Sequence, residues 1–260
     1  MIESLGATVL RGMSHSSRTL RLFVDSGEAM SRSLIRGRFR FQQTMLQCYA
    51  AGAESLPVIT LALAFIGVML TIEFSYHMKL VIREDSLVPA FAAVLMVREL
   101  GPVVVCLLLA SRVGAGIAAE LGTMRVTDQI DALRILSIDP IDFLIVPRWV
   151  GCVFAATVLS ILSVAVALVA GALIASTKLG YLPSEFFNSM FTFMHIRDLA
   201  SCLIKAGIFG TIIPIVASRH GLSCRPGAQG VGDAATAAVV ESSVLIIIAD
   251  FFVTYGFYAL

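Results

Sequence analysis

The feature that most constrains this chain is a set of long stretches without a charged residue. The clearest runs from Trp149 to Thr177, between Arg148 and Lys178. A helix needs about 20 apolar residues to cross about 30 Å of hydrocarbon. Across the whole chain 58% of residues are hydrophobic and 14% are charged, whereas soluble domains carry about 25% charged residues. The sequence therefore predicts an all-α polytopic membrane protein.

Five stretches are long and apolar enough to be transmembrane helices. We place them at about residues 48–72, 87–117, 149–177, 198–218 and 234–260, so that residues 48–260 form one five-span domain. Lysine and arginine are enriched in cytoplasmic loops. Most basic residues outside the spans lie before the first span and in the loops 112–148 and 219–233. This distribution predicts a cytoplasmic N-terminus and a C-terminus on the opposite side.

Residues 1–47 form a separate, amphipathic region in which arginines alternate irregularly with large apolar residues. A basic amphipathic helix that lies among the lipid headgroups has this character. We therefore expect a cytoplasmic, interfacial helix here, with a disordered basic tail as the alternative. No short apolar stretch is followed by a small-residue cleavage site, so a secretory signal peptide is not predicted.

Four ionisable residues fall inside the predicted spans: Arg98, Glu99, Lys205 and Asp250. Each costs at least about 2.5–3.5 kcal/mol at the centre of a bilayer, so it normally has a partner. Arg98 and Glu99 point about 100° apart on a helix, and each must find its partner on another helix. The four charges sum to zero, which favours a shared polar cluster. Such a cluster either lines a substrate path or only links helices, and both interpretations stay open.

A Gly101-Pro102 pair follows these charges directly. Proline has no N–H group and crowds the carbonyl four residues earlier, here that of Arg98. We therefore expect a kink in the second span. Interrupted helices at membrane depth often mark substrate sites, because freed carbonyls line a cavity.

The segment 120–138 after the second span is polar but helix-prone, and Asp139-Pro140 is expected to end it. Its pattern predicts a short amphipathic helix that docks on another protein. The residues expected to contact that partner are Glu120, Met124, Arg125, Asp128, Asp131 and Arg134.

Several catalytic signatures are missing from the sequence. It contains no GxxxxGK[ST] phosphate loop, no HExxH and no GxSxG motif, so we expect no enzyme activity. Its five cysteines show no spacing typical of a zinc site, and we expect no metal site. A net charge of +1 argues against binding to nucleic acid.

Several motifs, in this order, resemble the MlaE/YrbE family of ABC-transporter permeases over about residues 45–260. They are Arg98-Glu-Leu-Gly-Pro-Val103, Arg112-Val-Gly-Ala-Gly116, Ala119-Glu-Leu-Gly-Thr-Met124, Asp139-Pro140 with Pro147-Arg148, Cys202-Leu-Ile-Lys205, and Gly227-Ala-Gln-Gly-Val-Gly232 followed by Ala235-Thr236 and Val239-Val240.

The resemblance implies a homodimer in the bacterial inner membrane that moves phospholipids between inner and outer membranes and maintains outer-membrane lipid asymmetry. It implies cytoplasmic ABC ATPase subunits, which bind ATP and Mg²⁺, a STAS-domain subunit and a periplasmic hexameric MCE-domain protein. No cofactor is implied for this chain itself. By the same resemblance, residues 15–45 correspond to an interfacial helix, 120–138 to the coupling helix, and Arg98, Glu99, Lys205 and Asp250 to polar positions around a lipid cavity. Relatives in the family also carry sterols or plastid lipids, so the lipid stays open.

A stand-alone secondary transporter or ion channel is the alternative function. It would use the intramembrane charges as a proton or ion path. The absence of an inverted repeat weighs against it. A scaffold that only holds other subunits is a further alternative, which gains little from buried charges.

Overall fold

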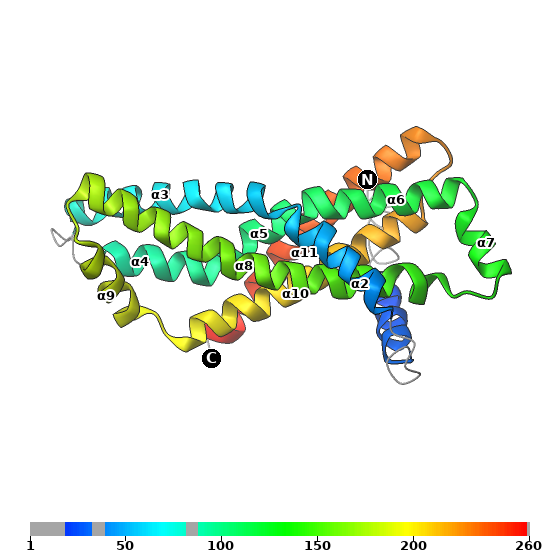
Figure 1. The fold of residues 1–260 in the computed structure, drawn as a ribbon, viewed down its shortest axis with the longest axis horizontal. Helices are drawn as coiled ribbons and strands as arrows, with labels where there is room; N and C mark the ends of the chain where they lie inside the picture. Colours follow the sequence, from blue (N-terminus) through cyan, green and yellow to red (C-terminus); the bar gives the residue numbers. More distant parts are fainter. Residues whose placement is uncertain (1–18, 33–39, 82–87, 259–260) are drawn as a thin grey trace, which may run out of the picture. The chain divides into compact units, whose positions relative to one another are not determined.

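The computed structural model describes residues 19–32, 40–81 and 88–258 (Figure 1). These residues form helices and contain no strand. Five helical stretches are long and apolar enough to cross a membrane: Phe41–Met78, Val88–Val126, Ile141–Leu179, Ile196–Leu222 and Ala228–Phe257. The prediction of an all-α polytopic membrane protein with five spans is therefore confirmed.

Most spans are built from α-helices separated by π-helical turns, here labelled η. The first two spans and the following segment comprise α2 (Phe41–Cys48), η1 (Tyr49–Ala53), α3 (Leu56–Val81), α4 (Val88–Leu95), η2 (Met96–Leu100), α5 (Gly101–Leu109), η3 (Ala110–Gly114), α6 (Ala115–Val126) and α7 (Gln129–Ile135). The rest comprises η4 (Ile141–Ile145), α8 (Val146–Ile174), η5 (Ala175–Leu179), α9 (Pro183–Phe193), α10 (Ile196–Leu222) and α11 (Ala228–Tyr258).

The chain divides into two compact units. Unit 1 contains the described part of Met1–Cys48 together with Ala110–Cys152 and Thr211–Val244. Unit 2 contains Tyr49–Leu109, Val153–Gly210 and Leu245–Leu260, the last as far as it is described. Each unit draws on several spans, because α8, α10 and α11 each contribute residues to both.

Unit 1 has a core where α6, α7, η4, α10 and α11 meet. Its buried members include Leu121 of α6, Ile130 of α7 and Ile145 of η4. The helix at residues 19–32 also packs here, because Leu22 contacts this core and the Phe23 ring lies edge-on to Trp149 at 5.5 Å. Its position among lipid headgroups stays a prediction, and residues 1–18 and 33–39 of the same region lie outside the described residues.

Unit 2 is held by close helix packing. A Cβ at Gly67 of α3 would lie 2.2 Å from the Ala167 carbonyl oxygen of α8, so the two backbones touch. Small residues allow this approach, which is a main source of helix association in membranes. The predicted helix in the 178–195 loop is α9, which packs against α4 and buries Phe186 and Met190. Its lying on the membrane surface stays a prediction.

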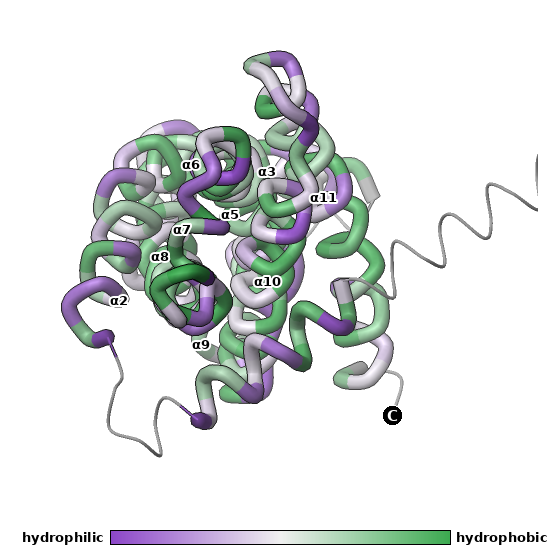
Figure 2. Tube along the Cα trace, turned by 90° about the vertical axis from the view of Figure 1, so that its right-hand side faces the viewer, coloured by the Kyte–Doolittle hydropathy of each residue, from purple (hydrophilic) through white to green (hydrophobic). Residues whose placement is uncertain are grey.

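The outer faces of the helices remain strongly apolar, and Figure 2 shows hydrophobic stretches interrupted by hydrophilic residues along the trace. The apolar stretch of α11 is the least buried of the five spans: only 17% of it is buried, against 56% for α10. Exposed large residues follow helical spacing along α11: Val240, Val244, Ile247, Phe251 and Tyr255. Lipid or another polypeptide must cover this face in a membrane.

The segment 120–138 differs from its prediction as one helix. The second span continues as α6 to Val126 instead of ending near Ile117, and a turn separates it from α7. Asp128 in this turn has a left-handed φ of 57°, which aspartate tolerates better than most residues. α7 ends before Asp139-Pro140, where the Ser137 and Ile138 amides donate to the carbonyls of Arg134 and Leu133, as in a Schellman motif.

Candidate functional site

The centre of the candidate site is Lys205 of α10, a completely buried lysine in unit 2. Three oxygens surround its ammonium nitrogen. Nζ donates to the Arg98 carbonyl at 2.9 Å and to Glu99 Oε2 at 2.7 Å. Asp250 Oδ1 lies 2.7 Å away in an ion pair, although it makes no hydrogen bond. Two of the three N–H donors of the lysine therefore have acceptors, and the Asp250 oxygen contributes its negative charge.

The carboxylates of Glu99 and Asp250 come from different helices and share this one lysine. Glu99 lies on η2 and Asp250 on α11. Thr254, one turn after Asp250, donates its hydroxyl to Glu99 Oε1 at 3.1 Å. We call Glu99, Lys205, Asp250 and Thr254 the lysine cluster. It carries a formal charge of −1, because one ammonium faces two carboxylates.

The side chain of Arg98 leaves the lysine cluster and pairs with Asp198 at the start of α10. Its Nε donates to Asp198 Oδ1 at 2.6 Å. The second oxygen, Oδ2, accepts from the backbone N–H of His195 at 2.8 Å. An acidic residue in the first turn that reaches back to the helix start caps the orphan amides there. Asp198 therefore fixes both the beginning of α10 and the orientation of Arg98.

The sequence explains why one helix, α10, carries a partner for Arg98 as well as a partner for Glu99. Asp198 and Lys205 are seven residues apart, and seven steps of about 100° return to nearly the same face of a helix. Two neighbouring residues of η2 can therefore each reach a different partner on α10. Ser201, between these partners in the chain, is fully buried as well, which makes this face of α10 polar.

Pro102 explains the backbone part of the site. Because it has no N–H, the Arg98 carbonyl loses its normal helical donor, and Lys205 supplies a replacement. The helix adjusts by a π-helical turn, in which the Gly101 amide donates to the Met96 carbonyl. Gly101 also admits α8, since a Cβ there would lie 2.2 Å from Val164 Cγ2. Short π-helical insertions occur frequently at functional sites.

The accessible part of the site presents both signs of charge. Side-chain exposure is 33% for Arg98, 28% for Glu99, 21% for Asp250 and 0% for Lys205. A ligand at this surface would meet a guanidinium and two carboxylates, while the ammonium stays covered. The arrangement suits a group that carries both a positive and a negative charge.

Three of the four predicted intramembrane charges, those of Glu99, Lys205 and Asp250, therefore meet. Arg98 contributes only its backbone carbonyl, and its side chain pairs with Asp198 instead. Sequence reasoning missed Asp198, which we assigned to the edge of the fourth span, and Thr254. The seven-residue spacing between Asp198 and Lys205 could have indicated Asp198, because it places both residues on the same face of a helix. Nothing comparable indicated Thr254, because threonine is common in spans.

A second charged group lies in unit 1, where Glu241 of α11 accepts from both Arg219 and His220 of α10. The Glu241 Oε2 to His220 Nε2 distance is 2.7 Å. Arg219 is only 6% exposed. This group links α10 to α11 within the unit.

The residues predicted to face a partner form ion pairs within unit 1. Asp131 of α7 pairs with Arg125 at 2.8 Å and with Arg134 at 3.2 Å. Glu120 pairs with Arg148 at 2.7 Å. Met124 packs against the unit 1 core. Exposed apolar side chains instead gather at the end of α7, where Ile135 is 84% and Leu136 68% exposed.

Among residues 19–32, 40–81 and 88–258, no three His, Cys, Asp or Glu side chains come together in a way that could hold a metal ion. The lysine cluster itself has two carboxylates, and both already face Lys205.

Comparison with known proteins gives a consistent answer. A sequence model described as Permease MlaE matches residues 44–255. A probable ABC transporter permease of Synechocystis is 35% identical, with 94% of each chain covered. Another from Rickettsia bellii is 37% identical over 93% of this chain and 95% of the relative.

A plant protein is similar too. The chloroplastic protein TRIGALACTOSYLDIACYLGLYCEROL 1 of Arabidopsis thaliana is 34% identical over 93% of this chain and 68% of the plant protein. With the family match over most of its length and five membrane-spanning helices, the chain belongs to the MlaE permease family and is a multi-pass permease subunit of the ABC-transporter type.

Proposed function

We propose that this permease moves phospholipids between the inner and outer membranes of a bacterium and so maintains the lipid asymmetry of the outer membrane. The observation that carries the proposal is the lysine cluster with Arg98, a site of mixed charge inside apolar spans. Charged residues inside a membrane are costly. Binding of a lipid headgroup during transport would account for these charges, whereas the linking of helices does not require charged residues. The plant relative, whose name is that of a glycolipid, supports a lipid as cargo.

The exposed charges favour a zwitterionic headgroup such as phosphoethanolamine. Its phosphate would face Arg98, and its ammonium would face Glu99 and Asp250, which are both partly exposed. The site does not simply present basic groups to an anionic headgroup, because Lys205 is buried and only Arg98 offers an accessible positive charge. Lys205 would hold the two carboxylates in place, and the apolar faces of the spans would contact the acyl chains.

Two copies of the chain would enclose the lipid cavity. The largely uncovered face of α11 supports this, because Asp250 lies on the same helix. On the cytoplasmic side the dimer would bind a pair of ABC ATPase subunits with a STAS-domain subunit. Those ATPases would bind and hydrolyse ATP with Mg²⁺, so this chain would be non-catalytic. A hexameric MCE-domain protein would receive the lipid in the periplasm.

The inner membrane is the proposed location, with the N-terminus in the cytoplasm. That orientation, which rests on the distribution of lysine and arginine, places α7 on the same side as the ATPases. Closure of the ATPases on ATP would move α7. Because α7 follows directly on α6, the last helix of the second span, the motion would pass along that span to Glu99 and narrow the lipid cavity.

The test is lipid transport by the complete complex between donor and acceptor vesicles with fluorescent phosphatidylethanolamine. Glu99→Gln and Asp250→Asn remove one negative charge each without changing side-chain volume. Each is expected to lower the ATP-driven rate about 10-fold or more, because a contact with a charged group contributes roughly 1.5–3 kcal/mol. Asp233→Asn is the matched control, since this exposed residue lies on the same helix, α11.

Wild-type transport by both charge variants, in complexes that are assembled and hydrolyse ATP, would contradict the proposal. The alternative of a stand-alone transporter or ion channel makes a different prediction. In that case the chain would purify without an ATPase, and the same variants would alter ion flux in vesicles that contain this chain alone.

A further inference from the structure

Asp198 is a buried acid that lies directly behind the accessible cation of the candidate site. Its side chain is 1% exposed, whereas that of Arg98 is 33% exposed. Asp198 Oδ1 accepts from Arg98 Nε at 2.6 Å, and Oδ2 accepts from the His195 amide at 2.8 Å. Because each oxygen of the carboxylate has a donor, the acid is fixed on the protein side of the guanidinium.

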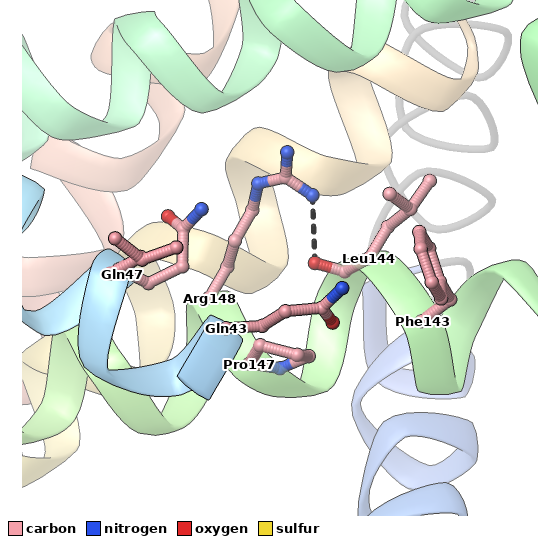
Figure 3. A pocket seen from close by; sticks show the side chains of 7 residues that line it. Gln43, Gln47, Phe143, Leu144, Pro147 and Arg148 are labelled. Carbon is pink, nitrogen blue, oxygen red and sulfur yellow. Dashed lines mark hydrogen bonds between the residues drawn. The ribbon is translucent and has the colours of Figure 1, made fainter. Parts of the chain in front are cut away.

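Arg148 in unit 1 shows the opposite arrangement of an arginine and its acid. The Arg148 side chain is 5% exposed, and that of its partner Glu120 is 57% exposed. Figure 3 shows the Arg148 guanidinium turned to the Leu144 carbonyl, to which Nη1 donates at 2.8 Å. There the cation is the buried member of the pair. In the pair of Arg98 and Asp198 the acid is the buried member, so the cation stays at a surface that a ligand can reach.

The buried acid also determines the net charge of the site. The lysine cluster carries a formal charge of −1, and Arg98 with Asp198 adds zero, so the whole site carries −1. Without the charge of Asp198 the site would be neutral, with Arg98 as its accessible cation. Salt screens buried charges much less than exposed ones. The Asp198 carboxylate therefore acts on a headgroup next to Arg98 without touching that headgroup.

We propose that Asp198 is a positioning residue that sets the headgroup selectivity of this permease through Arg98. The inference rests on the lipid transport proposed above. For the zwitterionic phosphatidylethanolamine, repulsion between Asp198 and the phosphate is offset by attraction to the ammonium group. Phosphatidylglycerol carries the phosphate without an ammonium group, so it meets the repulsion alone. Asp198 therefore favours the zwitterionic lipid over the anionic one.

Competition between these two lipids tests the selectivity. Donor vesicles contain equal amounts of both, with distinguishable fluorophores on their acyl chains, and the complete complex transports them to acceptor vesicles with ATP. Asp198→Asn removes the charge at constant volume and keeps an oxygen for the His195 amide. The ratio of phosphatidylglycerol to phosphatidylethanolamine transported is expected to rise about 3- to 10-fold, the effect of one charge at roughly 10 Å and an effective dielectric constant of about 20.

A purely structural role of Asp198 predicts a different result. A weakened start of α10 would slow both lipids and leave their ratio unchanged, because the two compete in the same vesicles. Asp198→Gln also removes the charge and supplies a side chain that capping boxes use at this helix position, so it should raise the ratio as well. Glu185→Gln is the matched control and should keep the wild-type ratio, because this exposed acid likewise lies in the first turn of a helix, α9.

A wild-type lipid ratio in both Asp198 variants would overturn the proposal, and so would an equal rise in Glu185→Gln. Failure of both Asp198 variants to assemble would assign the residue to folding and overturn it too. The transport function itself is tested by Glu99→Gln and Asp250→Asn. If these lose phosphatidylethanolamine transport while Asp198→Asn keeps the wild-type ratio, only the role of Asp198 is refuted. If all three variants behave as wild type, the proposed function fails with it.

Discussion

At the scale of single residues, Lys205 shows how a lysine can be completely buried in a membrane protein. Its three oxygen neighbours replace water around the ammonium group. Burying a charge without such partners is far more costly than burying a matched set. The Arg98 carbonyl is available because Pro102 follows at the fourth position, so a feature of the backbone sequence helps to fix the side-chain site.

Removal of the lysine alone should therefore destabilise the protein. Lys205→Met leaves two carboxylates without their cation, and breaking a buried pair costs roughly 3–5 kcal/mol. We expect a lower midpoint of thermal unfolding in detergent, followed by intrinsic fluorescence of Trp149. The triple variant Lys205→Met, Glu99→Gln, Asp250→Asn removes the charges together and should recover most of that loss.

The comparison of single and triple variants separates charge from packing. If the triple variant is as unstable as Lys205→Met, the lysine acts mainly through its volume and the charge account is wrong. If Lys205→Met unfolds at the wild-type midpoint, the buried ion pairs contribute nothing measurable to stability.

At the scale of helices, α3 and α8 show a contact that the apolar pattern does not reveal. Both are hydrophobic on every side, so the sequence alone does not say which faces meet. Gly67 marks the place in the structure, because its missing side chain lets α3 touch the backbone of α8 at Ala167. Gly171 does the same on α8, where a Cβ would lie 2.6 Å from Thr71 Oγ1.

A methyl group at Gly67 should force these helices apart. Overpacking of this kind costs typically about 1–3 kcal/mol, so Gly67→Ala is expected to lower the unfolding midpoint in detergent. Gly116→Ala in α6 is the control, since a Cβ there meets nothing within 4 Å and alanine favours a helix by up to about 1 kcal/mol over glycine. Similar midpoints for both variants would show that α3 and α8 separate at little cost.

The interrupted second span was only partly predictable at this scale. The missing N–H of Pro102 indicated a break beside Arg98, and the structure has a π-helical turn there. Nothing comparable indicated the π-helical turn at Ala110–Gly114. The helix also continues beyond the predicted end of the span near Ile117, because α6 reaches Val126 and the left-handed conformation of Asp128 makes the turn.

At the scale of the whole molecule, α7 is the element proposed to meet the ATPases, and the structure changes which residues should test it. Asp131 holds Arg125 and Arg134, so its substitution would disturb α7 itself. Ile135 and Leu136 are exposed and large. Ile135→Asp with Leu136→Asp should therefore remove a docking surface while the chain stays folded.

Co-purification of the ATPase with this chain measures that docking. The double variant is expected to lose most of the ATPase or its lipid-stimulated hydrolysis, because two exposed apolar side chains are replaced by charges. Ser137→Asp is the control, since it adds a charge at an exposed neighbouring position that aspartate tolerates with its φ of 58°. Wild-type assembly and activity of the double variant would contradict the proposed role of α7.

The sequence by itself determined the membrane class, the five spans and the residues that cannot remain unpaired in lipid, because hydrocarbon penalises every charge and every free backbone group whatever the fold. It also identified Gly101-Pro102, since the missing donor of proline is a property of the residue. Only the tertiary structure decided the pairing. Arg98 was equally able to face Asp250 or Asp198, and the positions of α10 and α11 around η2 determined that Lys205 joins Glu99 to Asp250 while Asp198 takes the arginine.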